Sequence, residues 1–151
     1  MQKITPFLWF DGKAEEAMNF YVSVFKNSKV LSIMHGPGGM TAGVRFQLEG
    51  VEFAAINGGP HFKFTEAISL YVDCKTQEEV DEYWEKLSAG GEKGRCGWLK
   101  DKYGVSWQII PSVLIEVLDF KDPAKSGRAM QAMLKMGKLD VKGLKQAYDQ
   151  P

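Results

Sequence analysis

Few residue types in this chain could carry out acid–base or nucleophilic chemistry, because its 151 residues include just two histidines and two cysteines. His61 lies in an expected loop, where an imidazole could act as a general base or simply bond to the backbone. Cys96 follows Arg95 and could supply a thiolate nucleophile or be a small structural thiol. The sequence identifies no oriented Cys–His pair. We expect Cys74 and Cys96 to be free thiols in a reducing compartment.

A larger set of candidates consists of aromatic, amide and hydroxyl side chains on expected strands and turns. Alternate residues of a strand face the same side of a sheet, so one set from each strand would line a concave surface. An aromatic wall with a few polar groups suits a flat or apolar organic ligand. The expected ligand-binding residues are Trp9, Asn57, His61, Ser69, Tyr71, Cys96, Trp98, Ser106 and Gln108.

Structural roles remain open for several of these residues. Trp9 could be a core or interface aromatic, and Asn57 could be a turn residue before two glycines. Gln108 follows Trp107, so one of the two faces the ligand and the other packs on the helices. Asp101 is expected to lie in a solvated turn.

The segments that would position these side chains occur twice. The segment Gly50–Asn57 aligns with Gly104–Pro111 as a repeat. Upstream of each segment lies an apolar run followed by an acid-rich amphipathic stretch. A unit of roughly 50 residues that mixes strand and helix cannot bury its own sheet face, whereas two facing copies can. We therefore expect two modules with the ligand in the cleft between them.

The predicted fold class is α+β, with paired βαβββ modules and a helical C-terminal tail. Module one covers residues 1–58, a linker covers 59–66, module two covers 67–111 and the tail covers 112–151. In module one, strands are expected at Ile4–Phe10, Val30–Met34, Thr41–Leu48 and Val51–Asn57, with a helix capped by Asp11 and ending at Lys26. In module two, strands are expected at Ile68–Asp73 and Val105–Ile110, with a helix capped by Thr76 and Glu79. A further strand near Lys93–Trp98 remains open.

The tail is expected to contain a helix at Val113–Leu118, one starting at Asp122-Pro123 and one capped by Asp140. Its methionines are expected to pack on the duplicated body or on a second subunit, with a promiscuous groove as the alternative.

Composition excludes several classes of function. Nineteen basic and nineteen acidic residues cancel, so no net field would attract nucleic acid or an anionic membrane surface. No apolar run approaches the roughly 20 residues that span a bilayer, and the N-terminus has no secretory signal pattern. We therefore expect a cytoplasmic protein with neither nucleic acid nor membrane as a partner.

Further segments of the chain carry a family resemblance: Thr5–Gly12, Asn19–Tyr21, Asn57–Pro60, Phe62–Ser69, Cys96–Asp101, Asp101–Gln108 and Lys135–Asp140. Together with the duplicated βαβββ unit, they resemble the vicinal oxygen chelate superfamily, which includes glyoxalase I, bleomycin-resistance proteins and extradiol dioxygenases. The chain is most similar to its PhnB-like branch, whose members are often labelled 3-demethylubiquinone-9 3-methyltransferase.

The resemblance implies one divalent metal, held by His, Glu or Gln on the first and last strands of each module. Pro6 and Ala54 occupy two of these positions and offer no side-chain ligand, and Gln108 alone binds a metal weakly. We therefore expect no metal and no cofactor. The glycine-rich segment Gly36–Gly39 leads into a strand rather than a helix, which also argues against an S-adenosylmethionine site. The four carried-over positions are Pro6 (beside Thr5 and Phe7), Ala54, Ile68 or Ser69, and Gln108.

Three functions follow from these observations. The favoured one is binding of a small, aromatic or apolar organic ligand by a homodimer, without a metal. The first alternative is a metal-dependent lyase, isomerase or dioxygenase of the superfamily, and the second is the methyltransferase of the family label. The sequence leaves open whether the protein is an enzyme.

Overall fold

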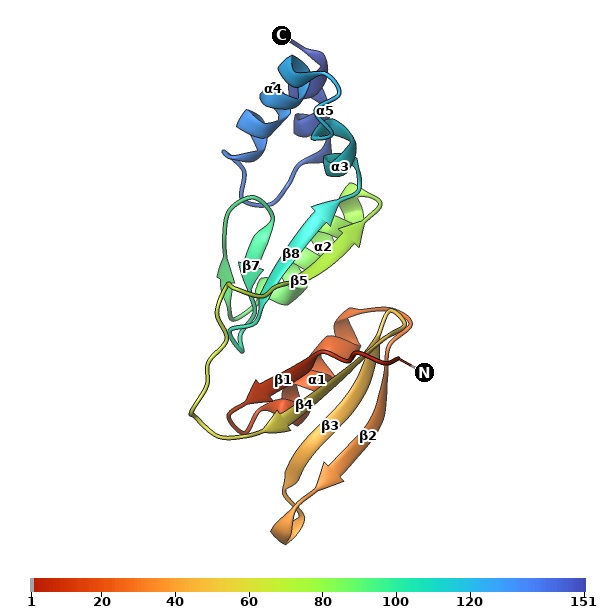
Figure 1. Cartoon of the computed structure of the whole chain (residues 1–151), viewed down its shortest axis with the longest axis vertical. Helices are drawn as coiled ribbons and strands as arrows, with labels where there is room; N and C mark the ends of the chain where they lie inside the picture. Colours follow the sequence, from red (N-terminus) through yellow and green to blue (C-terminus); the bar gives the residue numbers. More distant parts are fainter. Residues whose placement is uncertain (1) are drawn as a thin grey trace. The chain divides into compact units, whose positions relative to one another are not determined.

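The computed structural model describes residues 2–151, and the chain divides into two compact units with the boundary between Lys63 and Phe64. The first unit contains one sheet and one long helix (Figure 1). Its strand order is β1-β4-β3-β2, in which β1 is parallel to β4 and the other pairs are antiparallel. Its elements are β1 (Phe7–Phe10), α1 (Ala14–Val24), β2 (Lys29–His35), the short 3-10 helix η1 (Pro37–Gly39), β3 (Thr41–Leu48) and β4 (Val51–Asn57).

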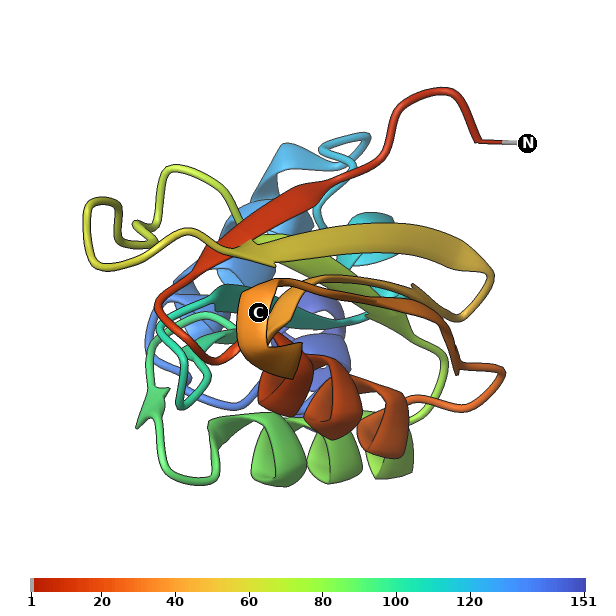
Figure 2. The ribbon, with the colours of Figure 1, turned by 90° about the horizontal axis from the view of Figure 1, so that it is seen from below.

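The β3–β4 hairpin and α1 both form for local reasons. Glu49 and Gly50 have φ values of 47° and 84°, the left-handed conformations that a two-residue hairpin turn of type I′ requires. Helix α1 buries Ala17, Met18 and Tyr21 and packs on one face of the sheet, as Figure 2 shows. Aromatic rings of Tyr21, Phe46 and Phe53 form the centre of this core.

The prediction that Asp11 caps α1 is wrong, because the N-cap position is Lys13 and its side chain makes no cap bond. Instead, Asn57 Oδ1 at the end of β4 accepts a hydrogen bond of 2.8 Å from the Ala14 N–H. The cap therefore comes from a residue that is distant in sequence.

The second unit repeats the same topology. Its strand order is β5-β8-β7-β6, with β5 parallel to β8 and the other pairs antiparallel, so the predicted duplication of the βαβββ unit is confirmed. Helix α2 packs against β5, β7 and β8 and lies behind β5 and β8 in Figure 1. The elements are β5 (Leu70–Cys74), α2 (Gln77–Ser88), β6 (Glu92–Lys93), β7 (Trp98–Lys100) and β8 (Ser106–Pro111).

The N-terminus of α2 has the predicted cap. Thr76 Oγ1 accepts from the Glu79 N–H at 3.2 Å. The Glu79 carboxylate accepts from Lys75 N–H at 3.1 Å, one residue before the N-cap. The strand left open near Lys93–Trp98 is present as two short strands, because Lys93 ends β6 and Trp98 begins β7, with residues 94–97 between them.

Three helices complete the second unit: α3 (Val113–Val117), α4 (Pro123–Met133) and α5 (Val141–Asp149). Both predicted caps are confirmed, because Asp122 accepts from Lys125 N–H and Asp140 accepts from Lys142 N–H. Ile110 of β8 forms a buried cluster with Leu139 and Leu144. Met133 and Met136 pack against that cluster, so these two methionines pack on the duplicated body. No helix among residues 2–151 combines the length and the apolar character needed to cross a membrane.

Candidate functional site

Three of the predicted site residues stand in one row across the sheet of the second unit. Gln108 on β8 is paired with Tyr71 on β5 and with Trp98 on β7. Residues directly opposite one another on neighbouring strands point to the same face, so these three side chains share a face. The alternate residues Trp107 and Ile109 are 2% and 0% exposed and belong to the opposite face, which α2 covers. The structure therefore assigns Trp107 to the core and Gln108 to the face away from α2.

The polar groups of this row have defined surroundings. Gln108 Nε2 donates a hydrogen bond of 2.9 Å to Ser69 Oγ, which fixes the side-chain amide beside the start of β5. Tyr71 is 49% exposed, and its pKa is raised by partial burial and by the nearby Asp73 carboxylate. Its hydroxyl therefore stays protonated and available as a donor at neutral pH.

A second row lies next to the first. Ser106 on β8 is paired with Lys100 on β7, and Lys100 is paired with Glu92 on β6. Ser106 is two residues from Gln108 and so faces the same side. These residues border a cavity of about 230 Å³ lined by Glu66, Glu92, Lys93, Gly94, Trp98, Leu99, Lys100 and Ser106.

The Ser106 hydroxyl is the unusual group in this cavity. The residue is 2% exposed, and its Oγ is the one buried side-chain polar atom without a hydrogen-bond partner among residues 2–151. Leaving a buried polar group unpaired costs about 1–3 kcal/mol. Native proteins rarely retain such a group without a role for it or a bound molecule that satisfies it.

Charged groups of opposite sign meet beside Ser106. Lys100 Nζ forms an ion pair with Glu66, which lies in the irregular segment before β5. The hydrogen bond to Lys100 lowers the pKa of Glu66, and the same contact raises the pKa of Lys100. Both groups are therefore charged at neutral pH. Lys93 Nζ is paired with Glu85 at 3.1 Å. No sequence pattern indicates the Glu66–Lys100 pair, because the two residues belong to different elements.

Trp9, in the first unit, is fixed by the segment that follows β4. Its Nε1 donates to Gly59 O at 2.9 Å, and the Phe62 ring meets it edge-on at 4.9 Å between centroids. A Cβ at Gly58 would lie 2.3 Å from the indole ring, so glycine is required there for this close approach. Trp9 is partly buried in this arrangement.

Asn57 and His61 have different surroundings. Asn57 caps α1 and also donates from Nδ2 to Thr41 O at 3.0 Å, so it links β4 to two neighbouring segments. His61 is exposed in the segment after β4. A role of either residue in ligand binding stays a prediction.

Cys96 contacts the C-terminal helical segment rather than the rows on the sheet. It has a φ of 58°, its N–H donates to Met136 O at 2.9 Å, and its thiol donates to Met133 O at 3.6 Å. Burial raises the pKa of the other cysteine, Cys74, to about 12, with smaller contributions from Glu79 and Asp73. Both histidines lie in the first unit and both cysteines in the second, so neither unit has a Cys–His pair of its own.

The prediction that Asp101 lies in a solvated turn is wrong. The residue is 2% exposed, and its carboxylate accepts hydrogen bonds from Tyr103 N (2.8 Å), Val105 N (3.1 Å) and Trp107 Nε1 (2.8 Å). Asp101 thus holds the β7–β8 turn and orients Trp107. An aspartate that starts a four-residue turn ending in Gly104 is a typical site for such side-chain-to-backbone bonds.

Two of the four positions expected for a metal, Pro6 and Ala54, carry no side-chain donor. Pro6 O accepts from Ala54 N–H at 3.0 Å, and Ser69 Oγ accepts from Gln108 Nε2. Across residues 2–151, His, Cys, Asp and Glu form no group of three that could hold a metal. The glycine-rich segment at Gly36–Gly39 joins the antiparallel strands β2 and β3, whereas an S-adenosylmethionine loop leads from a strand into a helix.

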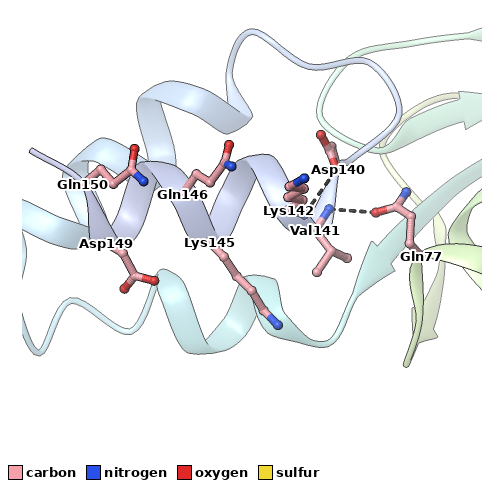
Figure 3. A pocket seen from close by; sticks show the side chains of 8 residues that line it. All are labelled: Gln77, Asp140, Val141, Lys142, Lys145, Gln146, Asp149 and Gln150. Carbon is pink, nitrogen blue, oxygen red and sulfur yellow. Dashed lines mark hydrogen bonds between the residues drawn. The ribbon is translucent and has the colours of Figure 1, made fainter.

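A separate hollow of about 480 Å³ runs along α5 (Figure 3) and is lined by Gln77, Asp140, Val141, Lys142, Lys145, Gln146, Asp149 and Gln150. Gln77 is fully engaged there, since its Oε1 accepts from Val141 N at 2.7 Å and its Nε2 donates to Leu139 O and Asp81 Oδ1. This glutamine joins α2 to the tail. The hollow is therefore a structural junction and contains none of the predicted site residues.

Comparison with known proteins identifies the relatives of this chain. A family model described as 3-demethylubiquinone-9 3-methyltransferase matches residues 2–110. A PhnB protein from Bacillus cereus is 43% identical, with a TM-score of 0.70, and the match covers 74% of this chain and 100% of that one. No curated protein matches the chain.

More distant structures share the fold alone. A protein from Pseudomonas aeruginosa is 16% identical with a TM-score of 0.63, over 74% of this chain and 98% of that one. The fosfomycin resistance protein FosX from Listeria monocytogenes, in complex with Mn(II), is 16% identical with a TM-score of 0.56, over 79% of this chain and 97% of that one.

The family model and the PhnB protein show that the chain belongs to the 3-demethylubiquinone-9 3-methyltransferase-like (PhnB) family, which has the fold of the vicinal oxygen chelate superfamily.

Proposed function

We propose that this protein binds a small aromatic or apolar organic molecule on the sheet face that carries Tyr71, Gln108 and Trp98, without a glyoxalase-type metal. The observation that carries the proposal is the cavity beside this row, in which the buried Ser106 hydroxyl has no partner among the described residues. The Trp98 indole offers a flat apolar surface, and Ser69, Tyr71 and Gln108 offer polar groups that would orient a ligand.

The two alternative functions have less support. The family name refers to methyl transfer, but the glycine-rich connection at Gly36–Gly39 joins two antiparallel strands. FosX is described with Mn(II), yet its likeness to this chain extends to the fold alone, and Pro6 and Ala54 supply no side-chain ligand. Neither observation favours an enzyme that needs S-adenosylmethionine or a divalent metal.

A neutral bicyclic aromatic compound, 2-naphthamide, tests the proposal by titration calorimetry. We expect saturable binding that is unchanged after the protein is treated with EDTA. Trp98→Ala should weaken this binding about tenfold, since it removes an aromatic contact and its buried area. Ile115→Ala is the matched control, because Ile115 is an exposed apolar residue of α3 and its loss should leave binding unchanged.

Three results would contradict the proposal. They are no binding of 2-naphthamide, equal weakening by both substitutions, and a stoichiometric transition metal in the purified protein whose removal abolishes binding. Titration with S-adenosylmethionine, followed by tryptophan fluorescence, tests the family name directly. Saturable binding of that cofactor would favour the methyltransferase.

A further inference from the structure

The ion pair beside Ser106 joins a rigid element to an irregular one. Lys100 is on β7 and is paired directly with Ser106 on β8. Its partner Glu66 precedes β5 in a segment without regular structure, and the Glu66 side chain is 60% exposed. An exposed ion pair of this kind contributes little to stability, so the Glu66 carboxylate can leave Lys100 at small cost.

The Glu66 carboxylate satisfies Lys100 but leaves the Ser106 hydroxyl unpaired. A carboxylate placed between Lys100 and Ser106 would accept hydrogen bonds from both the ammonium group and the hydroxyl. Replacing Glu66 by such a group keeps the charge pairing of Lys100 and gains one charge-assisted hydrogen bond. Because the carboxylate of the ligand gains this hydrogen bond and that of Glu66 does not, the ligand would displace Glu66 from Lys100.

A cationic ligand fits the same groups less well. It would have to take the place of Lys100 beside Glu66 and Glu92, and Lys100 belongs to a strand that is hydrogen-bonded on both sides. The carboxylates of Glu66 and Glu92 also hold the pKa of Lys100 above its ordinary value, with Glu66 the larger cause. Lys100 therefore remains a fixed positive charge in the cavity.

We infer that the ligand of this face is an aromatic carboxylate, whose carboxyl group displaces Glu66 from Lys100 and bonds to Ser106 while its ring lies against Trp98. Trp98 lines the same cavity of about 230 Å³ as Lys100 and Ser106, so one small molecule can reach all three. The inference rests on the proposed function, because it names the class of ligand for that same face.

The test compares 2-naphthoate with 2-naphthamide, which share a ring system and differ in charge. With the wild-type protein, calorimetry should show naphthoate binding about tenfold more tightly than naphthamide, as expected for a charge-assisted contact. The preference should shrink as salt is raised, because the groups are partly exposed. If naphthamide does not bind, the proposed function fails. If naphthamide binds as tightly as naphthoate, the proposed function stands and the carboxylate inference is overturned.

Single substitutions test which side chains cause the preference for naphthoate over naphthamide. Lys100→Gln should abolish the preference for naphthoate over naphthamide, and Ser106→Ala should weaken naphthoate about fivefold. Glu66→Gln should tighten naphthoate by about threefold, since it removes the competing carboxylate. Lys86→Gln is the matched control, because Lys86 forms a comparable exposed ion pair with Glu82 on α2. Unchanged preference in Lys100→Gln, or weaker naphthoate binding in Glu66→Gln, would overturn the inference; circular dichroism checks that each variant is folded.

Discussion

Replacing Ser106 by alanine should make the ligand-free protein more stable, which is the opposite of the usual effect of a buried substitution. The Ser106 hydroxyl is buried without a partner among residues 2–151, so the folded state carries a desolvation cost of about 1–3 kcal/mol for it. Alanine removes that hydroxyl and keeps the Cβ. The slightly lower preference of alanine for strands offsets part of the gain, and we expect a net increase in the free energy of unfolding of about 1 kcal/mol.

Ser126 provides the matched control for this substitution. It is also buried, at 0% exposure, but its Oγ accepts a hydrogen bond of 3.1 Å from Phe120 N–H. Ser126→Ala would leave that N–H without its partner, at a cost of about 1–3 kcal/mol that the better helix propensity of alanine reduces by about 0.5 kcal/mol. The two Ser→Ala substitutions should therefore change stability in opposite directions.

Urea unfolding followed by tryptophan fluorescence measures both effects. Trp84, Trp98 and Trp107 all lie in the second unit, so the signal reports mainly on the unit that contains both serines. Ser106→Ala should raise the midpoint at constant m-value, and Ser126→Ala should lower it. A loss of about 1 kcal/mol or more in Ser106→Ala would refute the reasoning, because it would mean that the hydroxyl is satisfied in the free protein.

Three further predictions concern other parts of the molecule. Asp101→Ala should lower the free energy of unfolding by about 3 kcal/mol, because three donors lose their acceptor, whereas Asp11→Ala should change it by less than about 0.5 kcal/mol; equal effects in urea unfolding would contradict this. Cys74 keeps its proton up to about pH 12 in the folded protein, against an ordinary value of 9.0, so its contribution to stability is complete below pH 9 and is lost as the pH rises towards 12. Between about pH 8 and pH 10, the free energy of unfolding of the wild type should thus fall by about 1 kcal/mol more than that of Cys74→Ala in the same urea assay. Parallel pH profiles of the two proteins would contradict this prediction. We also expect a homodimer, so light scattering after size exclusion should give twice the mass of the chain, and a monomer at micromolar concentration would disprove it.

Much of the fold could be predicted because its signals are local. Thr76, Asp122 and Asp140 each cap a helix through a backbone N–H two or three residues away, and such spacing is visible in any sequence. Gly50 and Gly104 each end a turn that leads into a strand, and this shared pattern makes the duplication recognisable from the order of residues alone. The short strands β6 and β7 have two and three residues, too few to show a periodicity.

The features that could not be predicted depend on contacts across the chain. Asn57 caps α1 from 43 residues away, whereas a sequence pattern indicates only caps adjacent to the helix, such as Asp11. The burial of Asp101 depends on the indole of Trp107, whose direction follows from the sheet. The row of Tyr71, Gln108 and Trp98 requires the strand register, which the repeat alone does not supply.

The two halves of the duplication differ in a way that bears on the ligand. The repeat and the strand register align Glu52 on β4 with Ser106 on β8, since each lies two residues before the position shared by Ala54 and Gln108. In the first unit, the Glu52 carboxylate meets Arg45 Nη1 of the neighbouring strand at 3.6 Å. In the second unit, the carboxylate is replaced by the Ser106 hydroxyl, and Lys100 takes its partner from the irregular segment at Glu66. Although Glu92 lies opposite Lys100 on β6, the ion pair of Lys100 is made with Glu66, which belongs to an irregular segment. Such a partner can leave and let an external carboxylate take its place, whereas in the first unit the carboxylate paired with Arg45 is fixed on a strand.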